Sequence, residues 1–133
     1  MGAGRFVRIE EAIANVIGDG GMDDVFTEPP SVSVCAEPVV VGHGTFGREE
    51  RMEDCERGVC TLWVRVVRES AAEAYRAASD AERILRVSDW ESAAVDGVRI
   101  NGIDTQDPVF EKRDSSGRYV YKIAVTVAAT REI

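Results

Sequence analysis

The chain has 133 residues, a formal net charge of −8 and a hydrophobic share of 44%. This length suits one domain with its own core and is short for two. The excess of carboxylates argues against nucleic acid as the main partner, because affinity for phosphates comes chiefly from Lys and Arg. No stretch approaches the roughly 18 apolar residues that cross a bilayer, so we expect no membrane contact. We therefore expect residues 1–133 to form a single globular domain.

The first predicted element is an amphipathic helix over residues 5–17, which the glycine-rich run 18–21 ends. The segment 22–30 finishes in two prolines, which favours an extended connector. In the next stretch Val32, Val34 and Ala36 alternate with Ser33 and Cys35, as in a strand with one buried face. Pro38 lacks an N–H group, so it bends this strand or places it at a sheet edge.

The segment 58–70 is the strongest predicted strand, because it is rich in valine and also carries Thr61 and Trp63. Ser70 and Glu73 then have the spacing of a capping box, which predicts a helix that runs to Arg86. Its inner face is mostly alanine, which permits close approach to a sheet. The inner residues are Ala74, Ala77, Ala78, Ala81, Ile84 and Leu85, and the outer ones are Glu73, Arg76, Asp80, Glu82 and Arg83. A further helical turn is expected from Ser88 or Asp89, with Trp90 covering the core.

The remaining segment, 97–130, is predicted to be β-structure. A turn at 114–117 joins 108–113 to 118–127 as an antiparallel hairpin, and in the last strand Tyr119, Tyr121, Ile123, Val125 and Val127 are expected to face the core. The order of elements is then α-β-β-α-β-β. This order predicts an α+β fold with a four-stranded, mainly antiparallel sheet and helices packed on one face.

Three glycines, Gly42, Gly44 and Gly47, follow a run of valines in the G-x-G-x-x-G spacing of a phosphate-binding loop. Such a loop is followed by a helix that covers the sheet with an apolar stripe and points its N-terminus at phosphate. The segment that follows here, REERMEDCERG at 48–58, is mostly charged and has more acidic than basic residues. We therefore predict that the glycines bind no nucleotide and belong to a flexible, charged loop between two strands.

His43, Cys55 and Cys60 are the other candidates for chemistry, as a zinc site or a Cys–His pair. A structural zinc site normally has four ligands in paired spacing, and these residues supply three in loose order. We interpret them as a loop histidine and spectator thiols, and Cys55 and Cys60 could meet across the base of the loop if oxidised. No catalytic, cofactor or metal site is predicted.

The second half of the chain carries a layout typical of one family. The strand TLWVRVVRES runs directly into an alanine-rich helix, and the hairpin DPVFEKRDSSGRYVYKIAVTV closes the chain. The telling positions are Pro108, Val109, Asp114, Gly117, Arg118 and Tyr119. Over about residues 61–130 the chain resembles the tail-terminator proteins of long-tailed bacteriophages and prophages, also called tail-completion or minor capsid proteins.

The resemblance implies a structural protein without catalytic residues or cofactor. Such proteins assemble as a ring, commonly a hexamer, on the end of the tail tube, stop its polymerisation and join it to the head connector. They would lie in the cytoplasm of the bacterial host during assembly and in the virion tail afterwards. The alternatives are a head–tail connector (neck) protein, a stand-alone bacterial binding domain, and a small nucleotide-binding enzyme that uses the glycines at 42–47.

The segment 43–57 is the longest stretch that no core argument explains. It is polar, carries both signs of charge and has strands at both ends, so it is expected to contact a neighbouring subunit or the tail tube. The predicted contact residues are Glu49, Glu50, Arg51, Glu53 and Asp54.

Overall fold

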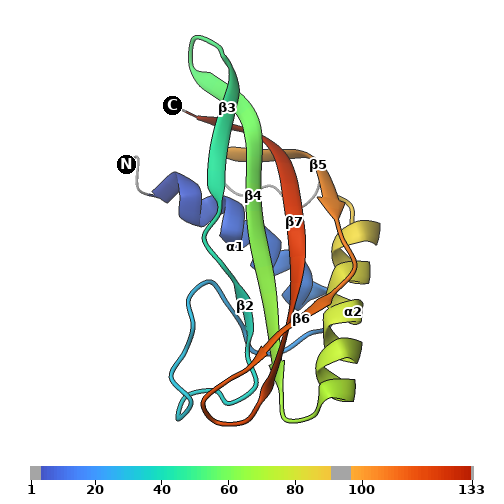
Figure 1. The fold of residues 1–133 in the computed structure, drawn as a ribbon. Coiled ribbons are helices and arrows are strands. Elements are labelled where there is room, and N and C mark those ends of the chain that lie inside the picture. The colour runs from blue at the N-terminus through green and yellow to red at the C-terminus, as the bar shows by residue number, and fades with distance from the viewer. Residues whose placement is uncertain (1–3, 91–96, 133) are drawn as a thin grey trace.

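The computed structural model describes residues 4–90 and 97–132, which form two helices and a sheet (Figure 1). In chain order the elements are α1 (Gly4–Asp19), β1 (Val25–Phe26), β2 (Val39–Val41), β3 (Thr45–Arg51), β4 (Cys55–Arg68), α2 (Ala71–Val87), β5 (Val98–Thr105), β6 (Val109–Arg113) and β7 (Tyr119–Glu132). Neither helix is long and apolar enough, over the residues described, to cross a membrane.

The sheet has seven strands in the described part of the chain, with the order β1-β2-β4-β7-β5. β3 pairs with β4 beside β2, and β6 pairs with β7 beside β5. β1 and β2 are parallel, and all the other pairs are antiparallel. The predicted α+β class is confirmed, but the four-stranded sheet and its α-β-β-α-β-β order are wrong. The prediction missed β1 and β3, and it placed β5 in β-structure without counting it as a separate strand.

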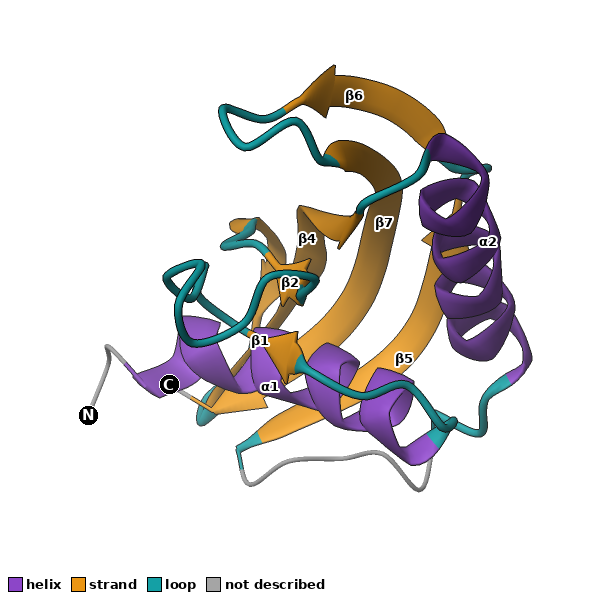
Figure 2. Ribbon diagram, turned by 90° about the horizontal axis from the view of Figure 1, so that it is seen from below, coloured by secondary structure: helices purple, strands orange, loops and turns teal. Residues whose placement is uncertain are grey.

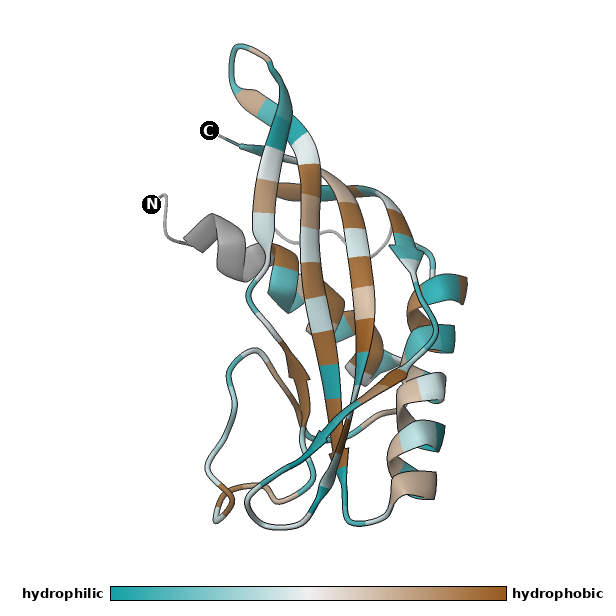
Figure 3. Ribbon diagram, in the orientation of Figure 1, coloured by the Kyte–Doolittle hydropathy of each residue, from teal (hydrophilic) through white to brown (hydrophobic). Residues whose placement is uncertain are grey.

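β4 and β7 form the spine of the sheet and pair along their whole length of 14 residues each, from Cys55↔Glu132 to Arg68↔Tyr119. Figure 3 shows hydrophobic and hydrophilic residues alternating along both strands. The buried set is Cys60, Leu62, Val64 and Val66 on β4 and Ile123, Val125, Val127 and Ala129 on β7. Successive side chains of a strand point to opposite faces, so this set faces one side of the sheet and forms the core there.

The helices complete this core from different directions. α1 crosses behind the sheet, whereas α2 runs along the side of β5 and β6 (Figure 1), and the view from below shows the curved sheet between them (Figure 2). The prediction placed both helices on one face of the sheet, and the observed arrangement does not match it. α1 contributes Ile9, Ile13, Val16 and Ile17 to the core, and α2 contributes Ala78, Ala81, Ile84 and Leu85.

α2 begins where the capping pattern predicts, because the Ser70 side chain accepts a hydrogen bond of 3.1 Å from the Glu73 backbone N–H. One residue of its predicted outer face is wrong, since Glu82 is buried. Its Oε2 accepts hydrogen bonds from Thr105 at 2.6 Å and from Arg86 at 3.0 Å. The indole of Trp90 donates to the Leu85 carbonyl at 2.9 Å and packs on the core as expected. Residues 91–96 of the predicted further turn lie outside the described residues.

The predicted strand through Val32, Val34 and Ala36 is wrong. Backbone N–H groups of Val34 and Cys35 both donate to the Ser31 carbonyl at 3.0 Å, so this segment is a turn. Val32 and Val34 are exposed, and the strand is β2 instead, directly after Pro38. Of the predicted strand, only Val39, Val40 and Val41 pair with β4.

Candidate interaction site

The glycine stretch lies at the start of β3 and not before a helix. Phe46 pairs with Cys60 and Gly47 with Val59, so the backbone is extended across these positions. A Cβ atom at Gly44 would stand 2.5 Å from Cys60 Sγ and 2.9 Å from the Thr61 carbonyl oxygen, so Gly44 serves the close packing of β3 on β4. The helix N-terminus that a dinucleotide-binding loop requires is replaced here by a strand.

The predicted flexible loop is also wrong, because β3 and the first residues of β4 form an antiparallel hairpin. We call residues 45–61 the hairpin arm, and Figure 1 shows its turn extending beyond the end of β7, with which the β4 half of the arm is paired. Its two strands pair from Thr45↔Thr61 to Arg51↔Glu56, and the Met52 N–H closes the turn on the Cys55 carbonyl at 2.8 Å. A Cβ atom at Gly58 would lie 2.2 Å from the Gly47 carbonyl oxygen, so the hairpin needs glycine there.

All five predicted contact residues lie on this arm and are exposed. Glu49, Glu50 and Arg51 belong to the end of β3, and Glu53 and Asp54 form the turn. Glu50 forms an ion pair with Arg57 across the two strands. The structure therefore gathers these residues at the tip of one projecting element, where they meet solvent.

A buried ion pair that the sequence did not reveal lies near the turn of the arm, where Glu56 pairs with Arg51. Arg131 Nε donates to Glu56 Oε1 at 2.7 Å, and Arg48 Nη1 lies 3.6 Å from Glu56 Oε2. The guanidinium of Arg131 also stacks 3.8 Å above the Phe46 ring. The hydrogen bond from Arg131 lowers the pKa of Glu56, although burial acts in the opposite direction. The arm is thus fastened to the end of β7.

His43 joins three segments just before the arm. Its Nδ1 lies 2.7 Å from Oε2 of Glu10, a fully buried residue of α1, and its Nε2 lies 3.7 Å from Glu28 Oε1. The Gly44 N–H donates to the other Glu10 oxygen at 3.0 Å. These contacts attach the connector between β2 and β3 to α1, which is a structural role for the histidine.

The thiols lack the properties of nucleophiles. Burial, helped by the charge of Glu10, raises the pKa of Cys60 to about 11. Burial and then Asp54 raise the pKa of Cys55, whereas a reactive cysteine needs a lowered pKa. The two cysteines stand five positions apart on one strand, roughly 16 Å, and on opposite faces, so β4 keeps them from pairing with each other. Within residues 4–90 and 97–132, no group of three or more His, Cys, Asp or Glu side chains could hold a metal ion.

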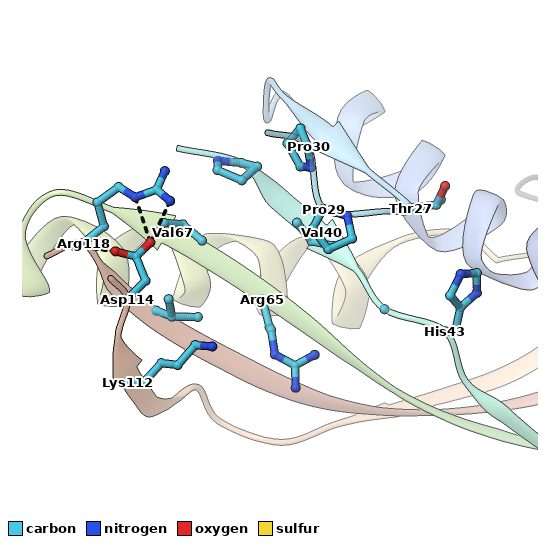
Figure 4. A pocket seen from close by; sticks show the side chains of 13 residues that line it. Thr27, Pro29, Pro30, Val40, His43, Arg65, Val67, Lys112, Asp114 and Arg118 are labelled. Atoms are coloured by element: carbon cyan, nitrogen blue, oxygen red, sulfur yellow. Dashed lines mark hydrogen bonds and ion pairs between the residues drawn. The ribbon is translucent and has the colours of Figure 1, made fainter. Parts of the chain in front are cut away.

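A groove of about 410 Å³ lies between the connector 27–38 and the β6–β7 hairpin. Figure 4 shows Asp114 and Arg118 at one end of it and His43 at the other. Its lining includes three prolines and three valines, and two of its arginines are ion-paired. Arg118 Nη2 lies 2.7 Å from Asp114 Oδ2, and Arg65 Nε lies 2.7 Å from Glu111 Oε1. Such a lining suits contact with another surface better than proton transfer.

The sequence matches no protein-family model and no curated protein. Among solved structures, the chain is similar to a chain from the "Virion of native gene transfer agent (GTA) particle", with a TM-score of 0.70 and 14% identity. The alignment covers 98% of this chain and 97% of that one. At this low identity the similarity shows a shared fold, from the first helix to the last strand.

Proposed function

We propose that this protein is a structural component of a phage-like particle, and within that class a tail terminator with a single domain over residues 1–133. The similarity in fold to a chain of a gene transfer agent virion, which spans 98% of this chain, is the observation that carries the proposal. The resemblance of residues 61–130, approximately, to tail-terminator proteins also supports the proposal. The first argument uses backbone geometry and the second uses the order of elements and residue types.

The chemistry of the described residues favours a structural role over catalysis. His43 is engaged with Glu10, and the pKa values of Cys55 and Cys60 are raised. The glycine stretch belongs to a strand, which disfavours the alternative of a nucleotide-binding enzyme. The work of the protein would then lie in its surfaces, in the host cytoplasm during assembly and in the virion afterwards.

The hairpin arm is the surface that we propose for contact with a neighbouring subunit or the tail tube. Its turn lies at the outer end of the sheet, Glu56 and Arg131 fasten the arm to β7 near that turn, and both signs of charge lie there. Glu49, Glu50, Arg51, Glu53 and Asp54 would make these contacts, in a ring that is commonly a hexamer. A head–tail connector (neck) protein is the second candidate, because the fold similarity is to a chain of a virion and is compatible with either position in such a particle.

The experiment is reconstitution with the tail-tube protein encoded beside this chain. The tubes are imaged by electron microscopy and their lengths are measured with and without the protein. A terminator yields capped tubes of uniform length, whereas a neck protein leaves tube length unchanged. Tubes that are neither bound nor limited in length would refute the tail-terminator role.

Charge reversal separates the arm from the rest of the molecule. The double variant Glu49→Lys, Arg51→Glu keeps the net charge and should weaken capping without unfolding the domain. The matched control reverses the exposed pair Asp80 and Arg83 of α2, whose Oδ1 and Nη2 atoms lie 3.3 Å apart. Equal capping by the two variants would show that the arm is not the contact surface.

A further inference from the structure

The groove between the connector 27–38 and the β6–β7 hairpin lies on the face of the sheet that is turned away from the core. Val40, Val67 and Val120 form its floor. Val40 pairs with Arg65 and Val67 pairs with Val120, so these valines stand on the face opposite the buried set of β4. The volume of about 410 Å³ falls in the range of ligand pockets, roughly 300 to 1,000 Å³. The groove can therefore take in a few side chains of a partner.

The walls of the groove are preorganised. Pro29, Pro30 and Pro38 line the connector side, and each proline ring fixes its own φ angle. On the other side, the Arg118 guanidinium donates to the carbonyl of Ala36, which ties the β6–β7 hairpin to the connector. Figure 4 shows Pro29 and Pro30 across the groove from Arg118. These walls lose little freedom when a partner enters, so binding there costs little ordering.

The lining carries more cations than acids, although the chain as a whole has a net charge of −8. Arg65, Lys112 and Arg118 line the groove together with one carboxylate, Asp114. When Glu111, the partner of Arg65, is added, the count is still three cations against two acids. Lys112 is exposed and forms no ion pair in the described part of the chain. An acidic partner would therefore find a cation that its own chain leaves unpaired.

The turn of the hairpin arm has the complementary character. We call residues 49–54 the arm tip; all six are exposed, and they carry four carboxylates and a single cation, Arg51. Met52 is 37% exposed there, and its flexible thioether chain adapts to an apolar floor. Glu50 is paired with Arg57. The acidic residues of the tip that form no ion pair, among the residues described, are Glu49, Glu53 and Asp54.

The arm tip and the groove of one chain lie toward opposite ends of β4. The turn of the arm leads into Cys55, the first residue of β4, whereas Arg65 and Val67 of the groove lie near its last. Cys55 and Val67 are twelve positions apart, about 40 Å along a strand, so the tip cannot reach its own groove.

A second copy of the chain can supply the missing partner. Two acidic tips repel each other, so a contact between copies joins the tip of one to the groove of the next. Such a head-to-tail contact closes into a ring when its rotation divides the circle.

We propose that the arm tip of one copy docks in the groove of the next copy, with Met52 on the valine floor and the carboxylates of Glu53 and Asp54 beside Lys112. This inference rests on the proposed function, because it takes the copies to meet in a ring. It names the surface of the neighbouring subunit that the arm contacts.

The first test is cross-linking between two variants that keep the charges of the contact. In a background with Cys35→Ser and Cys55→Ser, the one native thiol left is the buried Cys60. One protein carries Arg51→Cys in the tip and the other carries Thr27→Cys in the groove, and a short bis-maleimide is added. The control mixture pairs Arg51→Cys with Val87→Cys, at the exposed end of α2. We expect about tenfold more mixed dimer than in the control, since docking raises the effective concentration of the two thiols.

The second test exchanges the charges in the same cross-linking mixture. Glu53→Lys on the tip protein, or Lys112→Glu on the groove protein, should lower the yield of mixed dimer about fivefold, because like charges then face each other. The two reversals together should restore the yield. The matched control is Arg113→Glu, since Arg113 lies next to Lys112 but stacks on the Tyr119 ring and does not line the groove. This variant should leave the yield unchanged.

Both tests are carried out on the concentrated free protein and on protein assembled on tail tubes. A yield equal to the Val87→Cys control in both settings would overturn the proposal. So would a Lys112→Glu variant that behaves like Arg113→Glu, or a pair of reversals that restores nothing.

The outcomes for this contact and for the proposed function can be told apart. If the parent protein limits tube length but the mixed dimer stays at the control level, the docking contact is wrong and the function stands. If the mixed dimer forms and the charge exchange restores it but tubes are unaffected, the contact stands and the tail-terminator role is wrong.

Discussion

Arg131 near the end of β7 donates from Nε to Glu56 Oε1 near the start of β4 at 2.7 Å, with side chains only 12% and 11% exposed. The pair therefore joins the end of β7 to the hairpin arm near its turn. Removing one partner of such a pair leaves a charge with little water around it, which is costly. Stability and the geometry of the arm are coupled at this point.

Replacing Arg131 with Gln should lower the free energy of unfolding by on the order of 2 kcal/mol, because Glu56 loses its main hydrogen-bond donor. Urea denaturation measures this change. The matched control is Arg57→Gln, which breaks the half-exposed pair with Glu50 and should cost less than about 1 kcal/mol. Equal losses in the two variants would contradict the anchoring role of Arg131.

The same pair predicts a pH dependence. The hydrogen bond from Arg131 lowers the pKa of Glu56 below its ordinary value of 4.5. A lowered folded-state pKa stabilises the protein fully above the unfolded value, and this stabilisation is lost as the pH falls through the folded value. The difference in unfolding free energy between the parent and Glu56→Gln should thus be constant from pH 7 to about 5 and shrink below pH 4.5. A difference that grows in acid would show that the carboxylate is not stabilised in its charged form.

The packing of α2 gives a third prediction. Ala78 is fully buried against the sheet, so Ala78→Leu should cost about 1 to 3 kcal/mol by overpacking. Ala77 is only half-buried, and Ala77→Leu should cost clearly less. Thermal unfolding of both variants checks the face of the helix. A larger loss at Ala77 than at Ala78 would mean that the helix is rotated about its axis.

The elements that the sequence predicted well are those whose local pattern and final burial agree. β4 alternates over most of its length and β7 does so from Ile123 to Ala129, although Val120 is buried where Tyr119 and Tyr121 were expected to face the core. Ser70 marks the start of α2 through a contact three residues away. Such signals are local, so they can be found without knowing which segments pair in the fold.

The missed elements depend on partners that are distant in the chain. β3 is highly charged and carries no apolar alternation, but it pairs because β4 offers an edge beyond the end of β2. Glu82 looks like an outer-face residue, and it is buried because Thr105 of β5 and Arg86 satisfy its carboxylate. The alternation of Val32 and Val34 predicted burial, whereas their own chain leaves them exposed. For the candidate site, the sequence located the arm and its charges but not the Glu56–Arg131 anchor, since those residues are far apart in sequence.

The last prediction concerns Gly44, which the sequence pattern suggested as part of a phosphate loop and the structure places against β4. Gly44→Ala should be strongly destabilising, because its Cβ would meet Cys60 Sγ at 2.5 Å and the Thr61 carbonyl oxygen at 2.9 Å, and backbone cannot move aside as a flexible side chain can. Gly47→Ala is the matched control, since its Cβ would lie at an ordinary 3.7 Å from the Val59 carbonyl oxygen. We expect Gly44→Ala to unfold at lower temperature than the parent and Gly47→Ala to match it. We also expect millimolar NAD, ATP or GTP to leave the unfolding temperature of the parent and of Gly47→Ala unchanged. A stabilisation of several degrees by a nucleotide, lost in Gly47→Ala while that variant stays folded, would restore the phosphate-loop interpretation.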